Sequence, residues 1–129
     1  MRIHHIGYAV RNIKKCRQYF LNLGYFDEGK GVIDVERNIE ILFMRNEFQL
    51  IELVAPLNEK SSITNLLKRN GAIPYHICYV THDLEEKVTE LLGGGWIITQ
   101  KPSPAIAMNM KKIVFLYHKD IGIIEITEE

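Results

Sequence analysis

Residues 3–10 read IHHIGYAV and residues 74–80 read PYHICYV, and the two stretches align at an offset of 71 residues. The alignment places His5 of the first stretch opposite His76 of the second. Similarity at a fixed offset is typical of a duplicated structural unit. We therefore predict that the chain contains one small module twice, and that each copy opens with a histidine on its first strand.

Helix and strand signals follow each stretch in the same order. Asn12 and Asp83 are favourable N-cap residues, and apolar residues recur at helical spacing after each of them. Gly24 and the glycines ending at Gly95 stop the two helices. Runs rich in β-branched and aromatic residues then predict three strands in each half. Besides the opening strands, the predicted strands span residues 25–35, 39–45 and 48–54, and residues 96–100, 111–117 and 122–127.

These signals predict an α+β fold in which two β-α-β-β-β modules pair. The modules span residues 1–57 and 72–129, and a connector within 58–71 contains a short helix. We expect one domain over residues 1–129, since a half of this size is marginal on its own. Residues 101–110 have two prolines and no clear period, so we expect an irregular loop that edges a pocket.

Composition excludes several functional classes. Sixteen basic and sixteen acidic residues cancel, which gives no electrostatic reason to expect nucleic acid or an anionic membrane as a partner. The N-terminal residues lack the apolar stretch of a signal peptide, and no apolar run approaches the length of a membrane span. The two cysteines fall in no metal-type spacing, so we expect free thiols. A cytoplasmic protein is the corresponding expectation.

Four residues form a candidate metal site. His5 shares a strand face with two small residues, and Glu52 and Glu125 each interrupt a strongly apolar strand. A buried carboxylate needs a partner, because losing its hydration costs several kcal/mol. Taken singly, each histidine is more often an ordinary core or surface residue, and each glutamate more often lies on a solvated face. The duplication, however, predicts His5, Glu52, His76 and Glu125 jointly, and this donor set suits divalent Mn, Fe, Co, Ni or Zn.

The motifs resemble those of the vicinal oxygen chelate superfamily, also called the glyoxalase/bleomycin-resistance fold. The resemblance covers nearly the whole chain, and it includes residues 48–57, FQLIELVAPL, and residues 123–126, IIEI, beside the two opening strands. It implies a curved mixed sheet around a metal site and places the four candidate residues on the family's metal positions. It also implies a homodimer.

Within the superfamily, the connector ending in residues 68–71, KRNG, and the His76 strand most resemble methylmalonyl-CoA epimerases, followed by lactoylglutathione lyases, or glyoxalase I. Both classes move a proton alpha to a carbonyl through an enolate or enediolate. The implied substrate is an acyl-CoA thioester or a glutathione adduct. Glu125 would then be a ligand and a base in turn, and a second acid/base is needed on the opposite face of the carbon.

Glu36 and Glu40 are the candidates for this second acid/base. Glu36 resembles the first residue of an epimerase-like E-Q-G-V stretch, although RNI follows it here, and a solvated strand edge is the alternative for both carboxylates. Five basic residues could meet the phosphates of a CoA ester or simply be solvated. They are Lys68, Arg69, Lys101, Lys111 and Lys112.

Two further observations keep other functions open. The turn at residues 118–122 is shorter than in epimerases of this type, which puts the acyl-group specificity in doubt. A drug-binding resistance protein on the same fold uses no metal ligands, so the presence of all four counts against it. Ring-cleaving or fosfomycin-modifying relatives are a further alternative, and ring-cleaving members usually have only three ligands.

Overall fold

The computed structural model describes residues 1–129, which divide into two compact units. The N-terminal unit comprises His5–Tyr75, and the C-terminal unit comprises His76–Glu129 together with Met1–His4. None of the helices has the length and apolar content of a membrane-crossing segment. Each unit has its own buried apolar core.

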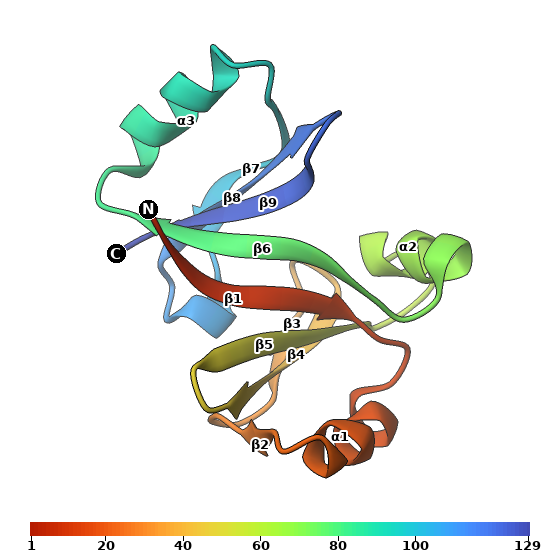
Figure 1. The fold of residues 1–129 in the computed structure, drawn as a ribbon. Helices are drawn as coiled ribbons and strands as arrows, with labels where there is room; N and C mark the ends of the chain where they lie inside the picture. Colours follow the sequence, from red (N-terminus) through yellow and green to blue (C-terminus); the bar gives the residue numbers. More distant parts are fainter. The chain divides into compact units, whose positions relative to one another are not determined.

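The N-terminal unit is a mixed sheet with two helices (Figure 1). Strand β5 pairs in parallel with β1 and antiparallel with β4, and β2 and β3 both pair with β4. The elements in chain order are β1 (Arg2–Ala9), α1 (Ile13–Asn22), β2 (Phe26–Asp27), β3 (Val32–Asp34), β4 (Ile39–Asn46), β5 (Gln49–Pro56) and α2 (Ser62–Asn70).

The strand predicted for residues 25–35 is wrong as a single element, because it divides into β2 and β3. The interruption contains Gly29, which has a φ of 78°. A left-handed residue cannot continue an extended strand, and glycine adopts this conformation without a steric cost. The N-terminal unit therefore has one short strand more than the predicted module.

Helix α1 covers one face of this sheet. It begins at the predicted cap, where the Asn12 side chain accepts a hydrogen bond of 2.9 Å from the Lys15 N–H. Its apolar stripe packs on alternate residues of β1, β4 and β5, which point to the same face. The buried members of this cluster are Val10, Ile13, Leu42, Met44, Ile51, Leu53 and Ala55.

Helix α2 packs on the other face, where Ile63 and Leu67 contact Ala9 and Val54. Ser61 caps this helix by accepting a hydrogen bond from the Ile63 N–H. The two helices therefore lie on opposite faces, because Ala9 and Val54 alternate with the residues under α1. The helix confirms the one expected between the two repeats.

The C-terminal unit has the predicted β-α-β-β-β order (Figure 1). Strand β9 pairs in parallel with β6 and antiparallel with β8, which in turn pairs with β7. Asp83 caps α3 by accepting a hydrogen bond of 2.9 Å from the Glu86 N–H. The elements are β6 (Ile73–Thr81), α3 (Leu84–Leu92), β7 (Ile97–Pro104), a 3-10 turn (Ile106–Met108), β8 (Lys112–His118) and β9 (Gly122–Glu128).

The loop predicted at residues 101–110 is wrong for its first part, since β7 continues to Pro104. The pairing of β7 with β8 shifts register between Ile98 and Gln100 and again between Gln100 and Ser103. Such bulges destroy the two-residue period by which a strand is recognised in a sequence. Prolines are also compatible with an edge strand such as β7. The predicted α+β class is confirmed.

Candidate functional site

The N-terminal unit buries a histidine–glutamate pair between β1 and β5. The parallel register sets Gly7 beside Glu52, and His5 lies two residues earlier on the same face of β1. His5 Nε2 lies 3.5 Å from Glu52 Oε1, and their side chains are 0% and 7% exposed. The prediction that His5 shares its face with Gly7 and Ala9 is consistent with this register.

An aromatic residue lines this pair. Phe43 of β4 lies directly opposite Glu52, and its ring meets the His5 ring edge-on, with centroids 5.3 Å apart and an interplanar angle of 80°. The other buried residues of β5 are apolar, so the carboxylate sits in surroundings that solvate a charge poorly. The negative charge of the Glu52 carboxylate is therefore stabilised little by solvent, and a bound cation would stabilise it.

The C-terminal unit builds the same pair from β6 and β9. Cys78 lies beside Glu125 in the parallel register, and His76 precedes Cys78 by two residues. His76 Nε2 lies 3.7 Å from Glu125 Oε2, and their side chains are 0% and 3% exposed. Phe115 of β8 lies opposite Glu125 and meets the His76 ring edge-on, with centroids 5.1 Å apart and an interplanar angle of 88°.

The two phenylalanines are the site residues that sequence reasoning missed. A signal for them existed, since Phe43 and Phe115 stand at nearly the same offset as the two histidines. The signal is weak because one aromatic residue in an apolar strand is usually a core residue. It gains meaning only once the register places each phenylalanine opposite a glutamate.

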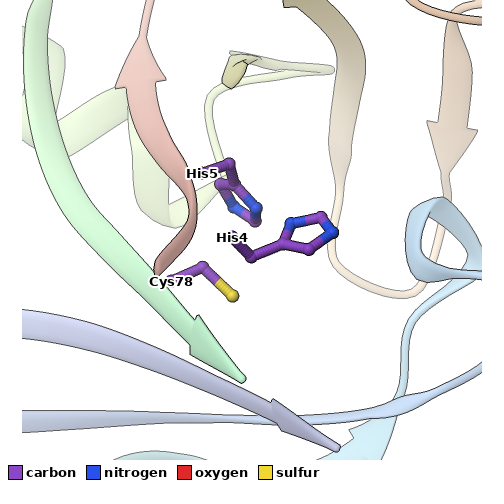
Figure 2. Close-up of side chains that lie close together, drawn as sticks. All are labelled: His4, His5 and Cys78. Carbon is purple, nitrogen blue, oxygen red and sulfur yellow. The ribbon is translucent and has the colours of Figure 1, made fainter. Parts of the chain in front are cut away.

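The units differ at the residue beside each glutamate, which is Gly7 in one and Cys78 in the other. Cys78 takes part in no disulfide, as expected, and is fully buried. Figure 2 shows the His4 and Cys78 side chains of the C-terminal unit close together, and their ligand atoms lie within 4.8 Å of one another.

Each histidine–glutamate pair offers one imidazole nitrogen and one carboxylate oxygen, both inaccessible to bulk solvent. Imidazole and carboxylate ligands suit divalent first-row ions. The two carboxylates supply the negative charge that a dication neutralises. The donor set of this chain therefore fits the implied metal.

One of the two predicted second acid/base residues, Glu40, lies on the face of the sheet opposite to that of Glu52. Glu40 of β4 is directly opposite Ala55, whereas Phe43 is directly opposite Glu52. Opposed residues share a face and successive residues alternate. Glu40 therefore lies on the face that α1 covers, and we do not give it a role in the chemistry.

Glu36 lies exposed in the turn between β3 and β4, and this turn is well braced. The Asp34 carboxylate accepts hydrogen bonds from the Arg37 N–H at 3.0 Å and from Arg37 Nη1 at 3.1 Å. Asn38 has a φ of 59° and donates a hydrogen bond of 2.7 Å from Nδ2 to Asn58 Oδ1. Asparagine tolerates the left-handed conformation that glycine adopts freely. Asn38 therefore adopts, in the turn after Glu36, a left-handed conformation that glycine also adopts readily.

Comparison with known proteins gives matches over most of the chain. Residues 4–115 match the family described as Glyoxalase/Bleomycin resistance protein/Dioxygenase superfamily. The chain is 31% identical over 132 residues to the mitochondrial methylmalonyl-CoA epimerase of Dictyostelium discoideum, and the match covers 99% of this chain and 78% of that protein.

Solved structures share the fold. Methylmalonyl-CoA epimerase from Mycobacterium tuberculosis matches with a TM-score of 0.85 and 23% identity, over 98% of this chain and 86% of that chain. A variant of the Streptomyces coelicolor methylmalonyl-CoA epimerase, in complex with 2-nitronate-propionyl-CoA, matches with a TM-score of 0.83 and 20% identity, over 100% of this chain and 94% of that chain.

Proposed function

Because the chain belongs to the glyoxalase/bleomycin resistance protein/dioxygenase superfamily, we propose that it is a metal-dependent epimerase that moves a proton alpha to the carbonyl of an acyl-CoA thioester. One observation carries the proposal. Each unit buries a His–Glu pair against a phenylalanine, in a chain whose relatives include methylmalonyl-CoA epimerases.

We propose that His5, Glu52, His76 and Glu125 together bind one divalent ion. They are His and Glu side chains of the kind that could hold a metal ion, and all four are buried. When bound, such an ion would supply Lewis-acid stabilisation of negative charge on a carbonyl oxygen. Divalent Co, Ni, Zn, Mn and Fe all suit these ligands.

The proton itself is moved by carboxylates of this chain. In our proposal Glu125 takes the alpha proton from one face of the carbon, and Glu36 serves the other face. A positioned general base contributes about 10²–10⁴-fold to such a step. The apolar residues around Glu125 keep bulk water away from the carboxylate.

Isotope exchange tests the proposal directly. The protein is loaded with each candidate ion in turn and incubated with methylmalonyl-CoA in heavy water, and mass spectrometry measures deuterium at the alpha carbon. We expect incorporation by the wild type, and a loss of at least about a hundredfold in Glu125→Gln. The matched control is Glu90→Gln, which removes an exposed carboxylate of the same unit that pairs only with Lys87.

Absence of deuterium with every ion would reject the epimerase. Two further assays then separate the alternatives. Formation of lactoylglutathione from methylglyoxal and glutathione would assign the lyase reaction on a glutathione hemithioacetal. A metal-free protein that turns over neither substrate would favour a non-catalytic binding protein.

A further inference from the structure

The N-terminal unit has a second feature that the proposed reaction does not use. A surface pocket of about 520 Å³ lies between the end of β5, helix α2 and Arg11, which is the second residue after β1. Pro56 and Leu67 give it an apolar part, and Arg11 and Lys68 bring cationic groups to it. Its volume is in the range of pockets that take small ligands.

The charge of this pocket favours an anion. Glu59 is the one acidic residue among those that line it, and Glu59 Oε2 lies 3.1 Å from Lys68 Nζ. Their side chains are 84% and 65% exposed, and an ion pair so exposed contributes little to stability. A bound anion can therefore replace Glu59 as the partner of Lys68. The Arg11 guanidinium takes part in no ion pair, so the pocket has a net positive charge with one guanidinium uncommitted.

The guanidinium lies at the end of α2. A Cβ added to Gly71 would be 3.8 Å from Arg11 Nη2, so this glycine leaves room for the group. A guanidinium presents several N–H donors in a fixed plane, an arrangement that matches phosphate oxygens. The same fork also matches a carboxylate, so it is the two cations of the pocket, Arg11 and Lys68, that favour the more highly charged phosphate.

The pocket also lies at the ends of β1 and β5, the two strands that contain the N-terminal histidine–glutamate pair. Glu52 and Pro56 lie on the same face of β5, because they are four residues apart. At a rise of about 3.3 Å per residue, their positions are about 13 Å apart along the strand. On the neighbouring strand the pairing reaches Val10, whose N–H donates to the Val54 carbonyl at 2.9 Å, and Arg11 comes next.

We infer that this pocket, named here the Arg11 pocket, binds a phosphate-bearing group and that the group is the phosphate end of the acyl-CoA substrate. The second half of this statement rests on the proposed function. Coenzyme A separates its thioester from its phosphates by a long flexible arm, so the reacting carbon and the phosphates need two distinct sites. The Arg11 pocket and the Glu52 face provide two such sites on one unit.

The test measures binding of three probes to the wild type, Arg11→Ala and Arg11→Lys by calorimetry. The probes are coenzyme A, pantetheine, which lacks the phosphates, and inorganic pyrophosphate. We expect Arg11→Ala to weaken coenzyme A and pyrophosphate about tenfold and to leave pantetheine unchanged. Arg11→Lys should recover part of the loss, because it keeps the charge without the planar fork. Lys14→Ala, an exposed cation of α1, is the control.

The outcomes separate this inference from the proposed function. Equal binding of coenzyme A by the wild type and Arg11→Ala overturns the Arg11 pocket, whether or not the thioester is epimerised. Pyrophosphate binding that depends on Arg11, without binding of coenzyme A, retains the anion site but removes the CoA assignment. For an active enzyme, Arg11→Ala should raise KM for methylmalonyl-CoA about tenfold and leave kcat unchanged. The reason is that a contact to the phosphates is equally strong in the bound substrate and in the transition state.

Discussion

The two units share a frame for binding a ligand but differ in what surrounds it. Both set a histidine, a glutamate and a phenylalanine at matching places on three neighbouring strands. Only the N-terminal unit adds the braced turn of Glu36 and the Arg11 pocket, and only the C-terminal unit has a thiol beside its glutamate. The comparison indicates that each unit provides one pair of the proposed metal ligands, whereas the proposed contacts to the substrate beyond the metal come from the N-terminal unit alone.

The strongest test of this symmetry removes one ligand from each unit. We expect His5→Ala and His76→Ala to lose metal affinity by similar factors, each above a hundredfold, since altering even an outer-shell partner of a ligand costs 10–100-fold. Metal analysis after equilibrium dialysis measures the loss, and isotope exchange should fall with it. His82→Ala is the control, because this exposed histidine pairs with Glu129 at the surface.

A variant that binds metal as the wild type does would remove its histidine from the ligand set. If only one of the two variants lost the metal, the idea that the units contribute equally would be wrong.

The second test addresses a residue that has no counterpart in the other unit. Glu36→Gln should lower isotope exchange by about 10²–10⁴-fold and leave metal binding unchanged, because the residue is proposed as an acid/base and not as a ligand. Glu40→Gln is the matched control, and its exchange rate should stay within a factor of two or so of the wild type, since it lies on the α1 face. Equal losses in both variants would contradict this distinction between the two carboxylates.

The two histidine–glutamate pairs could largely be predicted from the sequence, because strands have a regular two-residue period. The pairings of His5 with Glu52 and of His76 with Glu125 follow from regular strands, in which alternation and parallel register determine which side chains meet. The face on which Glu40 lies was inaccessible, because it depends on the register between β4 and β5 and a shift of one residue reverses it.

Irregular backbone accounts for the other differences. The split of β2 from β3 depends on one left-handed glycine, and the length of β7 is hidden by two register shifts. The Arg11 pocket was not predicted either, since it joins residues from three segments of the N-terminal unit whose proximity no local pattern encodes. Lys68 was singled out for phosphate contact, but the partner cation Arg11 was not.

A third prediction compares the two aromatic residues. Phe115 is buried and Phe43 is only partly so. Phe115→Ala should therefore lower the free energy of unfolding by about 3 kcal/mol or more, and Phe43→Ala by less. Urea denaturation of the metal-free proteins measures both, which keeps the linkage to metal binding out of the comparison. A larger loss of unfolding free energy in Phe43→Ala than in Phe115→Ala would show that burial does not determine which phenylalanine stabilises the fold more.

The smallest effect concerns the helices, where Cys16 of α1 corresponds to Lys87 of α3 at the offset of 71 residues. Burial raises the pKa of the Cys16 thiol from 9.0 to about 11, and its backbone hydrogen bond offsets only part of this rise. At pH 8 the folded protein should then have about a hundredfold less thiolate at Cys16 than the unfolded chain, and alkylation by iodoacetamide should slow accordingly.

The same shift fixes the sign of a pH effect on stability. Below pH 9 the Cys16 thiol is protonated in both the folded and the unfolded state, so its contribution to the free energy of unfolding is fully present. Between pH 9 and about 11 the unfolded chain loses the proton that the folded chain retains, and stability falls as pH rises. Alkylation rates of a Cys78→Ala variant, folded and in urea, isolate Cys16. Equal rates in the two states would show that α1 does not shield the Cys16 thiol from solvent.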